Sequence, residues 1–358
     1  MVFQQITIVG VGLIGGSIGL ALQERLGASV IGYDPAEPVR AEALRRRAIG
    51  GVADSPAQAV ADAELVFVAA PVSALAGAID EVLAAAGGDC AVSDVGSTKR
   101  ELVAGRGDQR FIGGHPLAGA ETSGVEHARA DLFDGATWYL TPGPGTSGAL
   151  YERLHKTLAG IGAQPTAIDA ADHDRVMASV SHLPHVFANV LVAQAARALG
   201  EGESVPATGP SFRDATRVAG ASATIWPDIY LSNREALVAL IDEAQGRLAE
   251  VRAALAGADR GAIERWNDAA RADRDALLGA GLVGGAVYEL RASVPDRPGI
   301  VAEIALALGR AGINIVDIAL SPSRDGGQGA VALWIQGEEQ ADRAVALIEA
   351  LDIPVARA

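Results

Sequence analysis

The chain has 358 residues, of which 49% are hydrophobic and 20% charged, and its formal net charge is −15. Its length predicts two or three domains, and its acidic balance disfavours nucleic acid and anionic lipid as partners. Cys90 is the single cysteine, so an internal disulfide is excluded. The sequence shows no signal-peptide pattern and no run of about 18 consecutive apolar residues, which predicts a cytoplasmic protein with no membrane span.

The first part of the chain, residues 1–168, alternates short β-branched runs with helical patterns. We expect strands at 6–9, 29–33, 65–69, 90–93 and 110–113, and later strands at 138–140 and 164–168 around a helix at 147–159. Such alternation is typical of a parallel sheet covered on both faces. The sequence therefore predicts a Rossmann-type, doubly wound α/β domain.

The remaining chain divides into two further predicted domains. Residues 169–280 carry apolar residues mostly at helical spacing, which predicts an all-helical domain with helices at 176–199, 234–256 and 260–278. A glycine-rich linker follows at 279–285. Residues 286–358 then show a βαββαβ order, which is typical of a ferredoxin-like domain. By analogy with other helical domains that follow a Rossmann-type domain, we expect this domain to form a dimer.

A glycine-rich turn follows the first predicted strand and opens the first helix. Gly10 permits the tight turn, Gly12 allows a pyrophosphate to approach the backbone, and Gly15 allows close packing of the helix on the strand. We expect Leu13 and Ile14 at the helix N-terminus, with its free N–H groups, to complete a dinucleotide site.

Asp34 ends the second predicted strand, about twenty residues beyond the glycines, where a carboxylate would accept a hydrogen bond from a ribose hydroxyl. Because it would repel a 2′-phosphate and no arginine directly follows it, NAD is favoured over NADP. The alternative interpretation is that Asp34 is only a turn residue before Pro35.

Several motifs in order along the chain resemble those of prephenate dehydrogenases, from the first strand to about residue 255. They are Asp-Val-Gly-Ser-Thr-Lys at 94–99, Gly-Gly-His-Pro-Leu-Ala-Gly at 113–119, Ser-His-Leu-Pro-His at 181–185, Arg-Asp-Ala-Thr-Arg-Val-Ala at 213–219 and Trp-Pro-Asp-Ile-Tyr at 226–230. The last domain, with Asp-Arg-Pro-Gly-Ile at 296–300 and Gly-Ile-Asn-Ile at 312–315, is similar to an ACT domain, a module that often binds amino acids.

The resemblance implies an NAD-dependent oxidative decarboxylation of prephenate to 4-hydroxyphenylpyruvate. This reaction needs a proton acceptor at the C4 hydroxyl and a cation for the side-chain carboxylate. His115, expected in a turn after a strand, is the candidate acceptor, and its alternative is a histidine bonded to backbone. By resemblance, Ser97 is expected to hydrogen-bond the C4 hydroxyl and His115 and, with Pro71, to contact the cofactor. The alternative is that Ser97 or Thr98 only caps a helix.

Arg217 is the candidate clamp for the substrate's side-chain carboxylate, because a guanidinium matches a carboxylate bidentately. Arg213 lies four residues earlier, so the two would share one helix face. We expect Arg213 to support the site through an ion pair with Asp174. A solvated arginine face is the alternative.

The pair His182 and His185 lacks a matching carboxylate or cysteine, and Pro184 between them would kink a helix, so we expect no metal. By resemblance, His185 faces the substrate and His182 supports the bend. Trp226 is likewise expected near the active site, although a bare tryptophan is more often part of a core.

The ACT-like domain carries a candidate effector site for an amino acid such as tyrosine. Its expected residues are Asp296, Pro298, Gly299, Ile300 and Asn314. The alternative is a domain that only dimerises.

Three other interpretations of the whole chain stay open at this stage. Arogenate, with an amine in place of the keto group, would be an equally compatible substrate. A hydroxyacid dehydrogenase would need a catalytic lysine in its helical region, and the chain has no lysine beyond Lys156. A non-catalytic amino-acid sensor would not need His115, Ser97 and Arg217 together.

Overall fold

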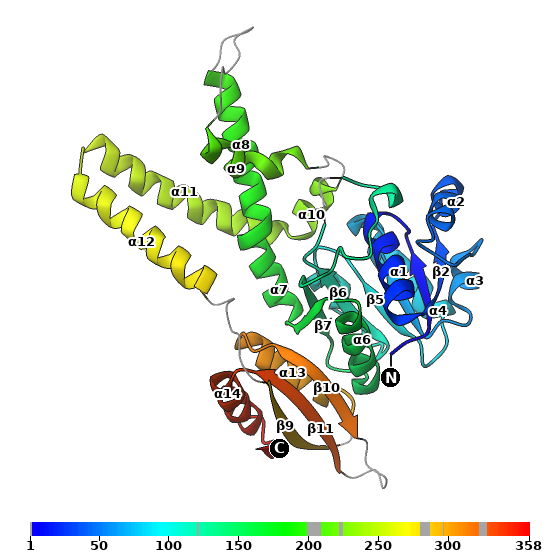
Figure 1. Cartoon of the computed structure of the whole chain (residues 1–358). Helices are drawn as coiled ribbons and strands as arrows, with labels where there is room; N and C mark the ends of the chain where they lie inside the picture. The colour runs from blue at the N-terminus through cyan, green and yellow to red at the C-terminus, as the bar shows by residue number, and fades with distance from the viewer. Residues whose placement is uncertain are drawn as a thin grey trace.

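The computed structural model describes residues 2–119, 122–198, 209–221, 225–279, 287–295, 297–321 and 328–358. Figure 1 shows an N-terminal α/β region, an arm of helices beside it and a smaller C-terminal region that contains a second sheet. This arrangement confirms the predicted fold class.

The first sheet has eight strands in the order β3-β2-β1-β4-β5-β6-β7-β8. Their bounds are β1 Gln5–Val9, β2 Ser29–Tyr33, β3 Gly51–Val52, β4 Leu65–Val68, β5 Ala91–Asp94, β6 Phe111–Pro116, β7 Thr137–Pro142 and β8 Gln164–Ala167. All neighbours pair in parallel except β6 and β7, which are antiparallel, so the expectation of a parallel sheet is wrong at that pair. The first six strands follow the doubly wound order of a Rossmann domain.

Alternation along the strands buries both faces of this sheet. Leu65 and Phe67 of β4 belong to one buried hydrophobic cluster, and Val66 and Val68 to another. Helices cover both faces of the sheet because the hydrophobic side chains on each face must be shielded from water. They are α1 Leu13–Leu26, α2 Glu37–Arg45, α3 Pro56–Val60, α4 Val72–Ala85, α5 Arg100–Val103 and α6 Gly148–Gly160, with the short 3₁₀ turn η1 at Val125–His127.

The middle region is helical, as predicted. Its elements are α7 Ala170–Met177, η2 Ala178–His182, α8 Leu183–Ala198, α9 Pro210–Thr216, η3 Arg217–Gly220, α10 Trp226–Ser232, α11 Arg234–Ala256 and α12 Arg260–Gly279. The first three form one continuous helix in which η2 is a π-helical turn just before Pro184. Proline lacks an N–H and disturbs the preceding turn. The expected disturbance therefore takes the form of a wider turn within the helix.

This continuous helix, Ala170–Ala198, is the one described segment that bears on the expected absence of a membrane span. By length and composition alone it is apolar enough to cross a membrane, although 28% of its apolar window is buried inside the protein. The sequence criterion of about 18 consecutive apolar residues does not detect this helix, because polar residues interrupt its apolar runs.

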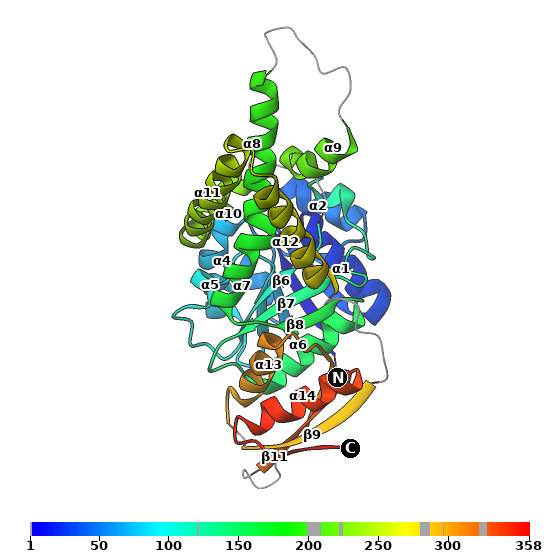
Figure 2. The ribbon, with the colours of Figure 1, turned by 90° about the vertical axis from the view of Figure 1, so that its left-hand side faces the viewer.

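The C-terminal sheet has the order β10-β11-β9-β12, and its neighbouring strands are all antiparallel. The elements are β9 Val287–Pro295, α13 Ile300–Arg310, β10 Ile315–Ser321, β11 Gln328–Gln336, α14 Glu338–Glu349 and β12 Val355–Arg357. This is the predicted βαββαβ order. Figure 2 shows this region below the first sheet, with α13 next to α6.

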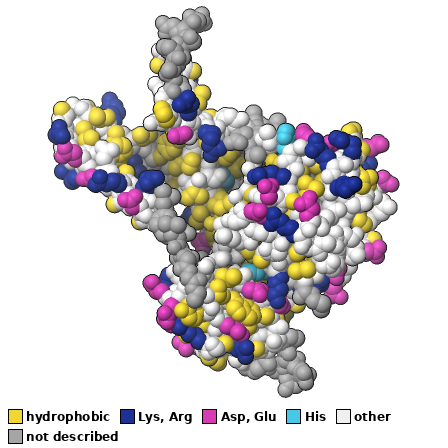
Figure 3. Space-filling view, in the orientation of Figure 1, with side chains coloured by type: hydrophobic (Ala, Val, Ile, Leu, Met, Phe, Trp, Pro, Cys, Tyr) yellow, Lys and Arg dark blue, Asp and Glu magenta, His cyan; other side chains and the backbone are white. Residues whose placement is uncertain are grey.

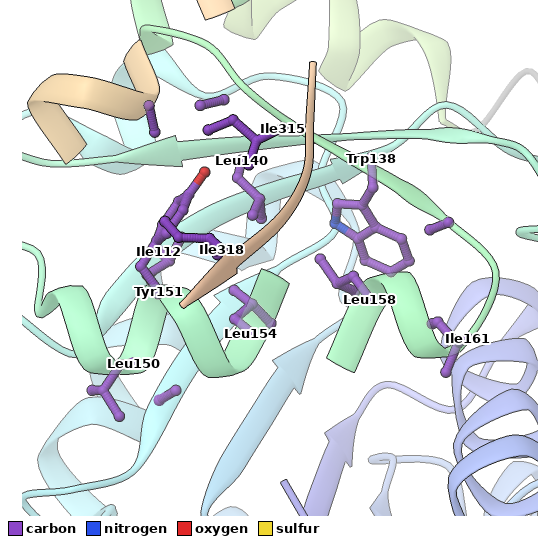
Figure 4. Packing of buried hydrophobic residues seen from close by; sticks show 14 of the residues in the cluster. Ile112, Trp138, Leu140, Leu150, Tyr151, Leu154, Leu158, Ile161, Ile315 and Ile318 are labelled. Atoms are coloured by element: carbon purple, nitrogen blue, oxygen red, sulfur yellow. The ribbon is translucent and has the colours of Figure 1, made fainter. Parts of the chain in front are cut away.

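The C-terminal region shares a hydrophobic core with the Rossmann domain. Ile315 and Ile318 of β10 pack with Tyr151 and Leu154 of α6, as Figure 4 shows, and all four belong to one buried cluster. The buried His155 of α6 adds a contact from its Nε2 to the Ile315 carbonyl, at 3.1 Å. Because apolar burial is the dominant favourable term in packing, the two units form a single body.

Candidate active site

The glycine turn after β1 has the geometry that a bound dinucleotide requires. Gly10 adopts φ +94°, and a Cβ there would overlap the Ala69 carbonyl oxygen. A Cβ at Gly15 would overlap the Gly10 carbonyl, so both positions exclude a side chain. A Cβ at Gly12 would meet nothing within 4 Å, which leaves its backbone open to a ligand. No side chain caps the N-terminus of α1, where Leu13 and Ile14 stand, so this turn fits a pyrophosphate.

Asp34 performs the turn role that was the alternative interpretation. One carboxylate oxygen accepts a hydrogen bond from the Ala36 N–H at 3.0 Å, and the other accepts one from the Val11 N–H at 3.2 Å. The carboxylate thereby ties the end of β2 to the glycine turn, where a ribose would lie. Arg40 donates to the Asp34 carbonyl at 2.6 Å, so the fold brings an arginine to this position although none directly follows in sequence.

Other predicted cofactor residues gather at the same edge of the sheet. Pro71 is the exposed N-cap of α4, just beyond β4, and the half-buried Ser97 follows β5. The carboxyl ends of parallel strands meet at one edge, which is where ligands of open α/β sheets bind. The glycine turn, Pro71 and Ser97 thus all lie in the ligand-binding region of this fold.

His115 belongs to a hydrogen-bonded chain of side chains. It lies within β6 rather than in a turn after it, which corrects the sequence-based expectation, and it pairs with Tyr139 of β7. Its Nδ1 lies 2.9 Å from Nε2 of His173, and Nδ1 of His173 lies 2.8 Å from a carboxylate oxygen of Asp174. We call His115, His173 and Asp174 the histidine relay.

Burial controls the charge of the histidine relay. It lowers the pKa of His115 well below 6.5, and nearby His173 and Lys99 add to the effect. Burial also lowers the pKa of His173, which its bond to Asp174 offsets only in part. Burial opposes ionisation of Asp174, but hydrogen bonds from His173 and from the Arg100 and Lys99 N–H groups lower its pKa overall. At neutral pH the relay therefore holds two neutral imidazoles and one carboxylate.

Asp174 also caps the short helix α5, which corrects two predictions. It accepts hydrogen bonds from the Lys99 N–H at 2.7 Å and the Arg100 N–H at 2.9 Å, so neither Ser97 nor Thr98 caps that helix. The carboxylate is thus committed to these donors and to His173, and the expected ion pair with Arg213 is wrong. Ser97 makes no hydrogen bond to His115 among the described residues.

A buried ion pair holds the loop that carries Ser97. The ammonium of Lys99 contacts the carboxylate of Asp94, and both side chains are fully buried. The same carboxylate accepts from the Gly96 N–H at 2.7 Å and the Gly114 N–H at 3.1 Å. Burial lowers the pKa of Lys99, while Asp94 counteracts this effect. The pair therefore ties the Ser97 loop to the strand that carries His115.

Replacing Lys99 by methionine is expected to lower the free energy of unfolding by about 3–5 kcal/mol, because it leaves the Asp94 carboxylate buried without its cation. The matched control is Lys156→Met, which removes a partly exposed pair with Glu152 on α6 and is expected to cost less than about 1 kcal/mol. Urea unfolding measures both. Equal losses in the two variants would contradict a structural role for the buried pair.

His185 and Trp226 lie together in the helical domain. Their rings stack with centroids 3.5 Å apart and planes 5° apart, and Nδ1 of His185 contacts the Tyr230 hydroxyl. The Nε2 of His185 is buried. Burial lowers the pKa of His185, and a hydrogen bond with the Val218 backbone offsets this effect only in part, so this imidazole is neutral.

His182 links this aromatic group to the histidine relay. It lies edge-on to Trp226, with ring centroids 6.2 Å apart. Asn233 lies 3.2 Å from Nδ1 of His182 and donates to the Asp174 carbonyl at 2.7 Å. Contacts therefore run without a break from His115 in the Rossmann domain to His185 in the helical domain. Among the described residues no group of three or more His, Cys, Asp or Glu side chains could hold a metal ion.

The two predicted arginines stand on separate helical elements. Arg213 lies in α9, which ends at Thr216, and Arg217 begins the 3₁₀ turn η3, so they do not share one helix face. Both are exposed. The turn η3 packs against α8, the helix that carries His185. Arg217 is therefore on the side of the site formed by the helical domain.

The structure separates the predicted effector residues. Pro298 and Ile300 line a cavity of about 320 Å³ against the N-terminus of α6, and Gly299 fits there because a Cβ would overlap the Pro144 carbonyl. Asn314 instead lines a different cleft and lies 3.2 Å from the Thr166 hydroxyl. Asp296 lies outside the described residues. The turn and Asn314 do not form one site within this chain.

Sequence reasoning missed His173 as a functional residue and assigned Asp174 the wrong partner. The signal was present: Asp172-His173-Asp174 follows the last strand of the first sheet and opens a helix. Tyr139, which lies edge-on to His173 with centroids 5.6 Å apart, was likewise read only as part of a strand.

The chain matches three family models in order. Residues 18–166 match the prephenate dehydrogenase nucleotide-binding domain, 169–267 the prephenate dehydrogenase dimerization domain, and 288–352 the ACT domain. It is 34% identical to a prephenate dehydrogenase of Bacillus subtilis, over 96% of this chain and 95% of that protein. It is 32% identical to a cyclohexadienyl dehydrogenase of Zymomonas mobilis, over 72% of this chain and 90% of that protein.

Solved structures agree with this assignment. The prephenate dehydrogenase of Aquifex aeolicus, in complex with hydroxyphenyl propionate and NAD⁺, superposes with a TM-score of 0.69 at 27% identity, covering 77% of this chain and 99% of that one. The arogenate dehydrogenase of Synechocystis superposes with a TM-score of 0.65 at 25% identity, over 76% and 100%. The glycine turn and the nucleotide-binding match identify NAD as the cofactor. With these matches and the histidine relay in place, the chain belongs to the prephenate dehydrogenase family and carries a C-terminal ACT domain.

Proposed function

We propose that the protein catalyses the NAD-dependent oxidative decarboxylation of prephenate to 4-hydroxyphenylpyruvate in tyrosine biosynthesis. The curated relatives and the order of the three domains support this activity. Bound NAD supplies the acceptor for the hydride that leaves ring C4. The chain's own residues must then remove the C4 hydroxyl proton, hold the substrate's side-chain carboxylate and keep water out.

The single observation that carries the proposal is the histidine relay. The ionised Asp174 accepts a hydrogen bond from the Nδ1–H group of His173, so Nε2 of His173 must be the acceptor in its contact with His115. His115 then carries its own proton on Nδ1 and presents the lone pair of Nε2. An imidazole fixed in this tautomer is suited to take the C4 hydroxyl proton. The orientation by His173 is a role that the motif at 113–119 could not reveal.

The other predicted residues take supporting roles. Ser97 would hydrogen-bond the C4 hydroxyl from the loop held by the buried ion pair. Arg217 would bind the side-chain carboxylate, and Arg213 would add positive charge nearby. His185 and the stacked Trp226 would line the substrate side of the site. Each role is a proposal that the variants below test.

The proposed activity is tested by following NADH absorbance with the purified full-length protein and prephenate. We expect turnover with NAD and a much lower kcat/KM with NADP, because Asp34 would repel a 2′-phosphate. Absence of NADH formation would favour a non-catalytic amino-acid sensor.

Arogenate is the second candidate substrate. Two similarities support arogenate as a candidate substrate. The chain is structurally similar to the Synechocystis arogenate dehydrogenase, and its sequence is similar to that of the Zymomonas cyclohexadienyl dehydrogenase. The two substrates differ only at the side-chain keto or amino group, so a comparison of kcat/KM on both decides the preference.

We further propose that the protein is a cytoplasmic homodimer. Figure 3 shows hydrophobic side chains gathered on the helical arm and in the hollow beside it. The exposed hydrophobic side chains of the helical region include Val190 and Leu191 of α8, Leu248 of α11 and Trp266 of α12. Exposed apolar area of this kind marks an interaction surface, and the matched domain is a dimerization domain.

We also propose domain boundaries of 1–168, 169–280 and 286–358, as the sequence pattern predicts. The ACT domain is proposed to bind an effector such as tyrosine.

A further inference from the structure

Asn233 stands at the corner between α10 and α11, at a position where asparagine usually caps the following helix. It is the N-cap residue of α11, yet its side chain makes no capping hydrogen bond, and only 2% of the residue is exposed. Its Nδ2 group donates instead to the Asp174 carbonyl at 2.7 Å and lies 3.2 Å from Nδ1 of His182. The buried amide of Asn233 therefore serves the active-site side of the helical domain and not its own helix.

The contacts of Asn233 fix the tautomer of His182. A carbonyl oxygen can only accept a hydrogen bond, so the amide atom that faces the Asp174 carbonyl is the nitrogen. The second hydrogen of this NH₂ group is then donated to Nδ1 of His182, which must carry a lone pair. Burial lowers the pKa of His182 to about 4, although Asp174 opposes this effect, so the imidazole is neutral and bears its proton on Nε2. His182 is thus a hydrogen-bond donor at Nε2, whereas His115 is an acceptor at Nε2.

His182 lies where the two halves of the site meet. It is close enough to His115 to affect the pKa of that residue electrostatically, and its own pKa responds in the same way to His173 and His185. Its ring stands edge-on to Trp226, with centroids 6.2 Å apart. It also ends η2, and π-helical turns are frequent at functional sites. The Nε2–H group of His182 has no acceptor among the residues that the structure describes, so this donor is available to a ligand.

The substrate has one charged group for which the residues discussed so far provide no partner. Prephenate and arogenate both carry a carboxylate on the ring carbon opposite C4, and this group leaves as CO₂ while the ring becomes aromatic. Its negative charge moves into the ring as the hydride departs, so an ion pair would stabilise the ground state more than the transition state and would raise the barrier. A neutral N–H donor forms a weaker hydrogen bond than a cation does, so it can orient the carboxylate at a smaller cost to the rate. His182, neutral and protonated at Nε2, is such a donor.

We propose that His182 donates a hydrogen bond from Nε2–H to the ring carboxylate that leaves as CO₂, and that Asn233 is the positioning residue that holds His182 in this tautomer. The inference rests on the oxidative decarboxylation proposed above. It applies to prephenate and arogenate alike, because both substrates carry the ring carboxylate. The two imidazoles then have complementary roles: His115 accepts the proton of the C4 hydroxyl, and His182 orients the group that departs.

Replacing His182 by leucine in the full-length enzyme tests the contact with the ring carboxylate. We expect KM for prephenate to rise about tenfold, because a hydrogen bond to a charged group is lost. The product 4-hydroxyphenylpyruvate has the side-chain carboxylate but no ring carboxylate, so its inhibition constant should change less than about twofold. His182→Gln retains an N–H donor and should keep KM within about threefold of wild type. An equal rise for substrate and product would overturn the assignment to the ring carboxylate, and an unchanged KM in His182→Leu would overturn the contact itself.

Asn233→Leu tests whether Asn233 acts through His182. It leaves the imidazole free to take the other tautomer and is expected to raise KM about fivefold. The double variant with His182→Leu should have the KM of His182→Leu alone, because a residue that acts through another has no effect once the other is gone. The matched control is Asn267→Leu, an exposed asparagine of α12 that bonds within its own helix, and its KM should stay within about twofold of wild type. Effects that multiply in the double variant would overturn the positioning role.

The pH dependence of KM in Asn233→Asp provides a readout that a merely structural role would not change. A carboxylate cannot donate to Nδ1 of His182, and its charge should raise the pKa of His182 toward the neutral range. Below this raised pKa the imidazolium carries both protons, and above it the remaining proton stays on Nδ1 beside the new carboxylate. KM for prephenate is therefore expected to rise about tenfold as pH increases through the raised pKa, because the donor at Nε2 is lost.

The wild-type enzyme should show no such rise, because its His182 keeps the Nε2 proton throughout the neutral range. The titratable groups that face His182 are the same in both proteins: Asp174 and His173 of α7, His185 of α8 and His115 of β6. A difference between the two profiles therefore reports the new carboxylate, and identical profiles would overturn the tautomer assignment. The proposed function fails separately, if the wild-type protein forms no NADH with prephenate or arogenate, and this inference then fails with it.

Discussion

Replacing His115 by asparagine is expected to lower kcat about 10²- to 10⁴-fold with little change in KM, because the variant loses the proton acceptor but no carboxylate contact. Asparagine retains a donor that can face His173, so the strand β6 should stay intact. Steady-state kinetics with prephenate, alongside thermal unfolding of both proteins, measure the effect. A large rise in KM with unchanged kcat would mean that His115 binds substrate and does not accept a proton.

The pH profile tests the same assignment independently. Burial holds the pKa of His115 well below 6.5, so its Nε2 stays unprotonated throughout the neutral range. The group is active in its neutral form, and activity is therefore lost only as pH falls through this lowered pKa. We expect kcat to stay level below the ordinary histidine value of about 6.5 before it declines. A decline centred at or above that value would contradict the buried relay.

His173→Leu is the companion variant for the relay. It removes the acceptor for the Nδ1 proton of His115 and should lower kcat by about 10²-fold, because the wrong tautomer becomes accessible. His173 acts through His115, so it is a positioning residue. A merely structural role would reduce stability without changing the pH profile, and that result would remove His173 from the mechanism.

Replacing Arg217 by glutamine is expected to raise KM for prephenate about 10- to 100-fold while kcat changes much less. The guanidinium is proposed to bind the side-chain carboxylate, which is remote from the reacting ring carbon and changes little during the reaction. A group that binds substrate and transition state equally contributes to KM and not to kcat. Arg217 stands on η3, which packs against α8, the helix that carries His185.

The matched control for this variant is Arg252→Gln, an exposed arginine of α11, which should leave both constants within about twofold of wild type. If Arg217→Gln lowers kcat and leaves KM unchanged, the roles assigned to residues 115 and 217 are interchanged. Lys in place of Arg217 should restore binding only in part, because an ammonium cannot bind a carboxylate through a bidentate fork.

The sequence by itself determined the domain order, the dinucleotide turn and the family. These depend on local patterns: alternation in strands, glycines at Gly10, Gly12 and Gly15, and short motifs whose spacing is fixed within one turn. Each residue's role there is set by neighbours a few positions away. This is why the predicted Rossmann, helical and ferredoxin-like domains were confirmed, and why the glycine geometry fits its predicted purpose.

Only the tertiary structure decided which side chains act together. His173 meets His115 across 58 positions and Asp174 caps α5 across 74, so no local pattern could reveal either partnership. The antiparallel pairing of β6 with β7 places His115 inside a strand next to Tyr139, and the docking of the ACT domain separates Asn314 from the turn at 297–300. A buried polar group takes whichever partner the packed core brings within hydrogen-bond distance, and that choice depends on the whole fold.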